Sequence, residues 1–170
     1  MNLPTLVIPF WKADSSFGMF SKWSPYPVVE DGITFHTSEH YLTYHKAMLF
    51  GDPDTANRVL ASSDPRQAKA VGRRVRNWDR DIWETNQLPI MVRALWLKVK
   101  QHKEIRQLLL QTDGMVLAEA SPYDNTWGVG YGPSDKRAHD SNQWKGRNLL
   151  GEAWMTVRYA LILGSEPILL

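Results

Sequence analysis

Helix-start signals recur along the first half of this chain and limit what it can fold into. A Thr37-Ser38 pair precedes a helical pattern that runs to about Phe50. Side-chain oxygens at such a position cap a helix by accepting hydrogen bonds from its first backbone N–H groups. Asp-Pro pairs at 52–53 and 64–65 give a second start signal, because proline fits the first helical position, where its missing N–H costs nothing. The sequence therefore predicts several short helices.

Further helices are expected in the second half of the chain. Between about Leu88 and His102, the apolar residues Ile90, Leu95 and Val99 recur at helical spacing. Residues 103–112 form another short helical pattern, which Asp-Gly at 113–114 ends, and the final helix is predicted over 149–163.

Strand signals are short and few. Segments 6–10, 28–30, 33–35 and 116–118 are rich in β-branched and apolar residues, and Asp31-Gly32 separates two of them. An Asp-Gly pair predicts a two-residue hairpin, because both positions tolerate a positive φ. Residues 14–27 and 131–143 are predicted loops. The sequence contains no repeat or linker, so we expect an α+β fold: a single compact domain over residues 1–170, predominantly helical with a few short β-strands.

Length and composition exclude several classes of protein. The chain has 170 residues, a net charge of only +2 and no cysteine. The low charge argues against a general nucleic-acid coat protein, and disulfide or thiolate chemistry is excluded. The N-terminus has no basic segment followed by an apolar run, and no stretch reaches the ~18 apolar residues of a membrane span. A cytoplasmic protein without a membrane partner is expected, and no obligate protein partner is predicted.

The segment Thr37-Ser38-Glu39-His40-Tyr41 carries the strongest functional signal. Glu39 falls in the first turn of the predicted helix, where the helix dipole stabilises negative charge. A carboxylate oriented in this way suits hydrolysis through a cationic transition state. The alternative is structural, since a glutamate in this position also completes the N-terminal turn of a helix.

The same segment matches a zinc-peptidase signature. Residues 36–40 read H-x-x-E-H, a motif that needs both histidines on one helical face. His36 follows a predicted strand and precedes the helix cap, so the two imidazoles need not face one point, and no third ligand is obvious. We therefore predict no metal and no other cofactor.

Several motifs in order along the chain resemble the YbiA-like family, also called NADAR, whose name marks an association with NAD and ADP-ribose metabolism. The matching segments are Phe20-Ser21-Lys22-Trp23-Ser24-Pro25, 31–35, 37–41, Lys46-Ala47, 68–73, Trp78 with Trp83, Glu119-Ala120-Ser121-Pro122, Asp124, Trp127-Gly128, and 144–151. Each motif is weak alone, whereas their order and spacing are specific. Two departures are Lys22, where the family usually has asparagine, and the insert 131–143, which is expected to reshape the rim of the pocket.

The resemblance implies an N-glycosidase that hydrolyses the bond between ribose C1′ and a base nitrogen in a phosphorylated, nucleotide-like substrate. The substrate is expected to be either ADP-ribosylated guanine in nucleic acid or an early intermediate of riboflavin biosynthesis, and the partner is that small molecule or nucleic acid. A non-catalytic sensor of ADP-ribose or nucleotides is the alternative. It would share the binding residues but not need Glu39.

Candidate roles follow from this chemistry. Breaking a glycosidic bond develops positive charge on the sugar, which carboxylates stabilise. Glu39 is the first candidate, and Glu119 and Asp124 are equal candidates for the second. For substrate binding we single out stacking rings, a basic group that could hold phosphate, a glycine that allows close backbone approach, and two residues of the family motifs: Trp83, Trp127, Lys46, Lys69, Arg73, Gly128, Lys22 and Tyr41.

Overall fold

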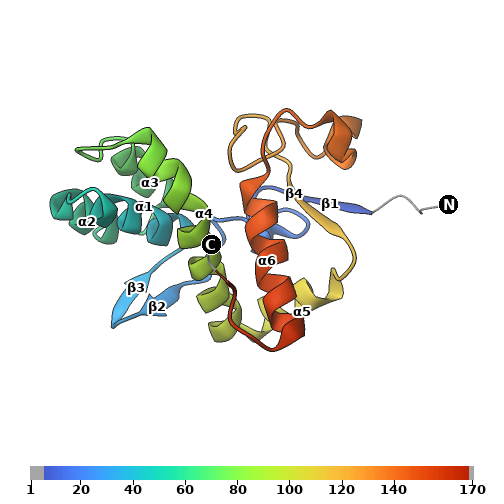
Figure 1. Cartoon of the computed structure of the whole chain (residues 1–170), viewed down its shortest axis with the longest axis horizontal. Helices are drawn as coiled ribbons and strands as arrows, with labels where there is room; N and C mark the ends of the chain where they lie inside the picture. The colour runs from blue at the N-terminus through green and yellow to red at the C-terminus, as the bar shows by residue number, and fades with distance from the viewer. Residues whose placement is uncertain (1–5, 169–170) are drawn as a thin grey trace.

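Three short helices in the first half of the chain begin where the sequence predicts. The computed structural model describes residues 6–168. Helix α1 (Ser38–Leu49) is capped by Thr37, whose side chain accepts a hydrogen bond from the backbone N–H of His40. Asp caps and first-position prolines start α2 (Pro53–Leu60) and α3 (Pro65–Gly72). The three helices lie together on one side of the molecule (Figure 1).

Helix α4 (Arg80–Gln101) is longer than expected. Its predicted start near Leu88 was wrong, because Asp79 caps the helix by accepting a hydrogen bond from the N–H of Ile82. The first turns are largely exposed, so they lack the apolar periodicity that marks the buried part. Pro89 lies inside the helix, where it removes one backbone hydrogen bond without ending the helix.

Two pairs of strands complete the fold. Strands β2 (Val28–Glu30) and β3 (Ile33–Phe35) form the predicted antiparallel hairpin, with positive φ at both Asp31 and Gly32. Strands β1 (Val7–Phe10) and β4 (Val116–Glu119) lie in parallel, with Phe10 opposite Glu119. The carboxyl ends of β1 and β4 therefore lie at one edge, from which residues 11–14 and 120–124 continue.

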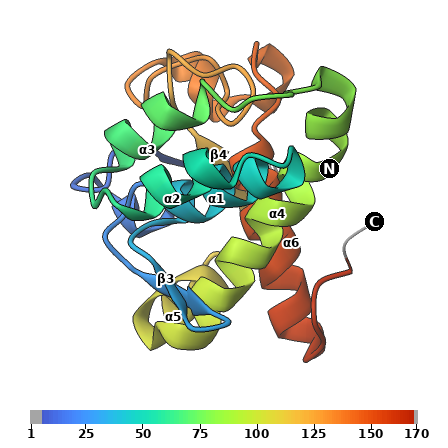
Figure 2. The ribbon, with the colours of Figure 1, turned by 90° about the vertical axis from the view of Figure 1, so that its left-hand side faces the viewer.

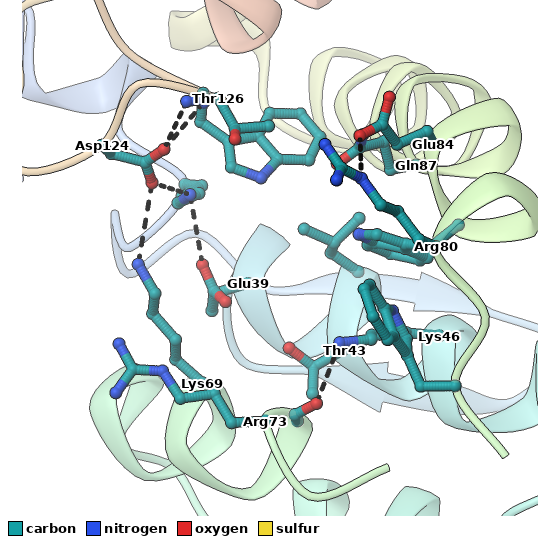
Figure 3. Close-up of a pocket in the computed structure, with 16 residues that line it drawn as sticks. Glu39, Thr43, Lys46, Lys69, Arg73, Arg80, Glu84, Gln87, Asp124 and Thr126 are labelled. Carbon is teal, nitrogen blue, oxygen red and sulfur yellow. Dashed lines mark hydrogen bonds and ion pairs between the residues drawn. The ribbon is translucent and has the colours of Figure 1, made fainter. Parts of the chain in front are cut away.

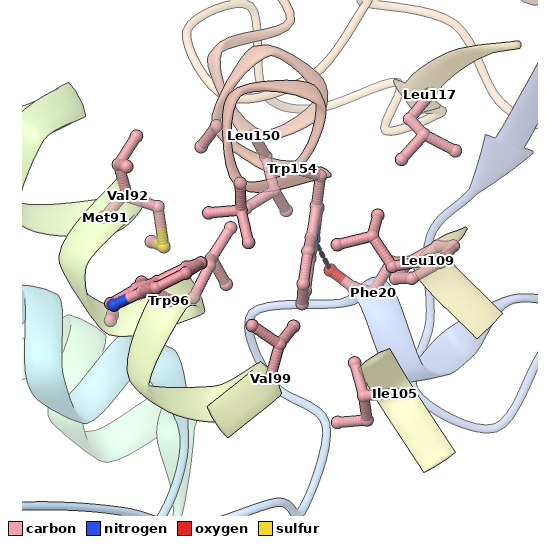
Figure 4. Packing of buried hydrophobic residues seen from close by; sticks show 14 of the residues in the cluster. Phe20, Met91, Val92, Trp96, Val99, Ile105, Leu109, Leu117, Leu150 and Trp154 are labelled. Carbon is pink, nitrogen blue, oxygen red and sulfur yellow. Dashed lines mark hydrogen bonds between the residues drawn. The ribbon is translucent and has the colours of Figure 1, made fainter. Parts of the chain in front are cut away.

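The main core lies where α4 packs against the C-terminal helix α6 (Leu149–Leu163), with α5 (Lys103–Gln111) closing one end (Figure 2). Trp154 is completely buried at the centre of this core, and its Nε1 donates a 2.8 Å hydrogen bond to the carbonyl of Phe20, in the short helix η1 (Gly18–Phe20) (Figure 4). Its one donor is thus satisfied while its ring fills the interior. The result is the predicted α+β fold, one compact and mainly helical domain.

Residues 131–143 are more ordered than the predicted loop. They contain two 3₁₀ helices, η2 (Lys136–His139) and η3 (Ser141–Gln143). Ala138 is buried, and its carbonyl accepts a 3.0 Å hydrogen bond from Nε1 of Trp144. The segment packs beside β1 through a small second core. None of the helices described is both long and apolar enough to cross a membrane.

Candidate functional site

A cavity of about 340 Å³ lies between α1, α3, the start of α4 and the loop that follows β4 (Figure 3). Its lining combines carboxylates, cations and indole rings, and consists of Lys22, Glu39, Leu42, Thr43, Lys46, Lys69, Gly72, Arg73, Trp78, Arg80, Trp83, Glu84, Gln87, Asp124, Thr126 and Trp127. Most of the residues singled out in the sequence therefore meet at one place, although they come from distant segments.

Glu39 is held on the wall of this cavity by fixed donors. The first turn of α1 places it beside residues 22–23, and its backbone N–H donates a 3.0 Å hydrogen bond to the carbonyl of Lys22. Its Oε2 accepts a 3.2 Å hydrogen bond from Nε1 of Trp23 and lies 3.7 Å from Nζ of Lys22. Only 4% of Glu39 is exposed, so its carboxylate is shielded from bulk water and has a fixed orientation.

Asp124 is the second carboxylate of the cavity. Its Oδ1 accepts hydrogen bonds from the backbone N–H groups of Thr126 and Trp127, at 3.0 and 2.9 Å. Its Oδ2 lies 3.5 Å from Nζ of Lys22 and 3.7 Å from Nζ of Lys69. Figure 3 shows the resulting chain of contacts from Lys69 through Asp124 to Glu39.

Lys22 links the two carboxylates. Burial opposes its charge, but the neighbouring carboxylates Glu39, Glu119 and Asp124 outweigh this and raise its pKa. For Asp124, burial alone would raise the pKa, whereas Lys22, the N–H of Trp127 and Lys69 together lower it. At neutral pH the cavity therefore contains an ammonium group in contact with an ionised aspartate. The ammonium also lies over the ring of Trp127, 5.1 Å from its centroid.

Glu119 lies outside this cavity. It ends β4 and lines a neighbouring cavity that shares one wall with the first. The side chain of Asn148 fixes this strand end, accepting a 2.9 Å hydrogen bond from the N–H of Glu119 and donating a 2.8 Å bond to the carbonyl of Leu117. Oε2 of Glu119 is buried without a hydrogen-bond partner, and burial raises the pKa of this carboxyl to about 7. The structure thus separates the two candidates for the second carboxylate.

Basic and aromatic side chains occupy the opposite side of the cavity. Nζ of Lys46 donates a 3.1 Å hydrogen bond to the carbonyl of Gly72 and lies over the rings of Trp78 and Trp83, at 5.5 and 5.3 Å. Burial lowers the pKa of Lys46. Arg73 ends α3 and is exposed at the rim. The lining contains more cations than carboxylates, so this side can accept an anionic group.

The sequence-based predictions did not include some of the lining residues. Arg80 and Gln87 lie on the first turns of α4, which sequence reasoning missed together with the start of the helix. The cap at Asp79 was the available signal. Thr43 lies one turn after Glu39 on α1, and helical spacing from Glu39 could have identified it.

Three expectations about the site differ from the structure. Tyr41 is buried away from the cavity, where its hydroxyl donates to Glu30, a carboxylate also bonded by Arg93. Gly128 does not line the cavity: a Cβ there would lie 2.8 Å from the carbonyl oxygens of both Glu119 and Asp124, so its role is to let these two segments approach. The insert 131–143 contributes no lining residue to this cavity or its neighbour, because it packs against β1.

The histidines of the H-x-x-E-H motif are not arranged as a pair of ligands around one point. His36 and His40 meet edge to face at 5.7 Å between ring centroids, and Nδ1 of His40 is 2.8 Å from Oγ1 of the capping Thr37. Within residues 6–168, no group of three or more His, Cys, Asp or Glu side chains has a geometry that could hold a metal ion.

Comparison with known proteins shows the class of protein that this fold and site define. The NADAR domain matches residues 9–162, and the chain belongs to this family. Its relatives include N-glycosidase R617 of Acanthamoeba polyphaga mimivirus, 33% identical over 152 residues that cover 86% of this chain and 89% of R617.

Two further relatives extend the comparison. Protein irg-1 of Caenorhabditis elegans is 37% identical over 131 residues, which cover 76% of this chain but only 62% of irg-1. The NMR structure of YbiA from Escherichia coli matches with a TM-score of 0.77 and 31% identity, covering 96% of this chain and 89% of YbiA. YbiA is also named an N-glycosidase.

Proposed function

We propose that this protein is an N-glycosidase that hydrolyses the bond between ribose C1′ and a base nitrogen in a phosphorylated, nucleotide-like substrate. The observation that carries the proposal is the buried carboxylate of Glu39, held by Trp23 and Lys22 on the wall of a cavity that also contains Asp124. Two of the relatives bear the name N-glycosidase, which supports the same reaction.

Glu39 is the group that faces C1′ in this proposal. As the C1′–N bond breaks, its electron pair moves to the departing nitrogen, and positive charge develops on the ribose ring. A preorganised carboxylate stabilises that charge most effectively where water is excluded, as it is around Glu39. Water then adds to C1′ and gives one proton to Glu39 as general base, and this proton passes to the nitrogen of the departing base, so that Glu39 is ionised again at the end of the cycle.

Asp124 orients the ribose in this mechanism. Its carboxylate is fixed by two backbone N–H groups and two lysines, so it can accept hydrogen bonds from ribose hydroxyls. Lys22 pairs with both Glu39 and Asp124. With a cation between them, the two carboxylates can stay close without strong mutual repulsion.

The phosphate group of the substrate is assigned to the basic side of the cavity. Lys69 lies on α3, Arg73 directly follows this helix, and Lys46 comes from α1. Charged hydrogen bonds to phosphate are stronger than neutral ones, and Lys46 lies over Trp83, which offers a surface for stacking. The substrate is either ADP-ribosylated guanine in nucleic acid or an early riboflavin intermediate, and both share a ribose joined to nitrogen.

A paired turnover assay tests the proposal. The protein is incubated with an ADP-ribosylated guanine oligonucleotide and, separately, with riboflavin-pathway intermediates, and release of the ribose product is measured. We expect Glu39→Gln to keep the fold and lose at least a hundredfold in kcat, the general-base contribution being about 10²–10⁴. Glu152→Gln, an exposed change on α6, is the matched control. Full turnover in Glu39→Gln would remove Glu39 from the mechanism, whereas binding without turnover, in the wild type as in Glu39→Gln, would instead favour a non-catalytic sensor.

A further inference from the structure

A second cavity, of about 610 Å³, lies on the other side of Lys22, Lys69 and Asp124. It forms at the carboxyl ends of the parallel strands β1 and β4, an edge where ligands commonly bind in folds with parallel strands. Its lining comes from the segments that leave these strands, from the residues after η1 and from α3, and includes Trp11, Lys12, Trp23, Glu119 and Tyr123.

The two cavities are separated by side chains. Lys22, Lys69 and Asp124 line both cavities, and both lysines pair with Oδ2 of Asp124, at 3.5 and 3.7 Å. Trp23 lines the second cavity while its Nε1 bonds Glu39 in the first. Glu39 therefore lies close to the boundary between the cavities.

The inner wall of the second cavity contains a carboxyl group with an oxygen that lacks a hydrogen-bond partner. Glu119 is only 5% exposed, and its Oε2 has no hydrogen-bond partner. A buried polar atom without a partner costs free energy unless a ligand or water satisfies it. A carboxyl group is well suited to the N–H and ring-nitrogen edge of a heteroaromatic base, because it can accept and, when protonated, donate a hydrogen bond.

The outer wall is aromatic. Trp11 and Tyr123 lie 6.2 Å apart between ring centroids at an angle of 48°, and Tyr123 is 89% exposed. Nζ of Lys12 lies over the Trp11 ring at 4.9 Å. Trp11 is partly exposed, and accessible rings bind nucleobases by stacking, at about 1–3 kcal/mol per base.

Charge distinguishes the second cavity from the first. Its basic residues, Lys12, Lys22, Arg66 and Lys69, are matched by the acids Asp14, Asp64, Glu119 and Asp124. The first cavity has an excess of cations. A phosphate group is therefore favoured in the first cavity, and a neutral ring in the second.

We propose that the second cavity is the subsite for the leaving base: a heteroaromatic ring stacks on Trp11 and Tyr123 and hydrogen-bonds the Glu119 carboxyl, while the phosphorylated ribose occupies the first cavity. This assignment rests on the proposed N-glycosidase activity. It gives Glu119 a role in holding the base as the C1′–N bond breaks, and it makes Lys22 and Asp124 the boundary at which ribose and base meet.

Fragment binding tests the assignment without turnover. The probes are 9-methylguanine, which has no glycosidic bond, and ribose 5-phosphate, each titrated into the full chain and followed by NMR. Tyr123→Ala changes an exposed side chain, so folding is not at risk, and Trp11→Ala is the second variant. We expect each to weaken 9-methylguanine binding at least about fivefold, the lower limit of the stacking range, and to leave ribose 5-phosphate binding unchanged. Arg73→Ala should weaken ribose 5-phosphate binding and leave 9-methylguanine binding unchanged.

Specific outcomes would overturn the assignment. It fails if the wild type does not bind 9-methylguanine, if Trp11→Ala and Tyr123→Ala leave that binding unchanged, or if Trp83→Ala alone abolishes it, which would place the base in the first cavity. Tyr159→Ala, which removes an exposed ring on α6, is the control. Failure of the proposed activity is a separate result: it is the absence of ribose release from every N-glycoside tested.

Discussion

Replacing Glu119 by glutamine should change how the stability of this protein depends on pH. Glu119 is almost fully buried, and burial raises its pKa to about 7 from an ordinary value of 4.5. Below pH 4.5 the carboxyl is protonated in both the folded and unfolded states, so it carries no penalty. As the pH rises from 4.5 to 7, it ionises in the unfolded chain but stays protonated in the fold, and stability is lost.

The size of this effect follows from the two pKa values. At 1.36 kcal/mol for each pH unit, the penalty on the free energy of unfolding reaches roughly 3 kcal/mol above pH 7. Glu119→Gln cannot ionise and escapes this penalty. Any cost of placing an amide at this position is the same at every pH and cancels from the comparison.

Urea unfolding of both proteins at pH 4 and pH 8 measures the effect. The stability of Glu119→Gln relative to the wild type should increase by roughly 3 kcal/mol between these pH values. Glu152→Gln, an exposed change, should show almost no such increase. If the difference between Glu119→Gln and the wild type is the same at both pH values, then Glu119 is not held neutral by burial and the reasoning is refuted.

Three further changes probe the rest of the site. Arg73→Ala should raise KM for the substrate about tenfold with a smaller change in kcat, because a phosphate contact is remote from the bond that breaks. Asn148→Ala should lower the free energy of unfolding by about 2–4 kcal/mol, since it leaves the buried N–H of Glu119 and carbonyl of Leu117 unpaired. Lys22→Met should cost about 3–5 kcal/mol in urea unfolding at pH 8, because it leaves buried carboxylates without their cation.

Matched variants separate these effects from general damage. Arg106→Ala, which lies outside both cavities, should leave KM unchanged. Asn148→Gly also loses the side-chain hydrogen bonds, but glycine adopts the positive φ of 56° at this position without strain. The loss of stability in Asn148→Gly therefore reports the hydrogen bonds, and any additional loss in Asn148→Ala reports backbone strain. Lys100→Met, an exposed change on α4, should alter stability little. An equal loss of stability in Lys22→Met and Lys100→Met would show that the buried ion pairs contribute nothing.

Local chemistry in the sequence was sufficient to predict most of the secondary structure. Caps at Thr37, Asp52 and Asp64 and the hairpin at Asp31-Gly32 depend on neighbouring atoms, and the structure contains each of them. The start of α4 was missed because its first turns are exposed and have no apolar period. The ordered segment 131–143 was missed because its order comes from packing against β1, a contact that local sequence does not reveal.

Most residues of the candidate site could likewise be identified from the sequence, whereas their arrangement in space could not. The sequence indicated Glu39 as an oriented carboxylate, because the helix start that places it is a local feature. It left Glu119 and Asp124 equivalent, and only the tertiary structure placed Asp124 on the wall of the Glu39 cavity and Glu119 outside it, since β4 ends at Glu119 while the following turn brings Asp124 to Lys22 and Lys69. The burial of Lys22 between carboxylates and the pairing of Tyr41 with Glu30 also depend on residues distant in sequence. Long-range packing decides which charged groups come into contact, so no local sequence pattern could have predicted these contacts.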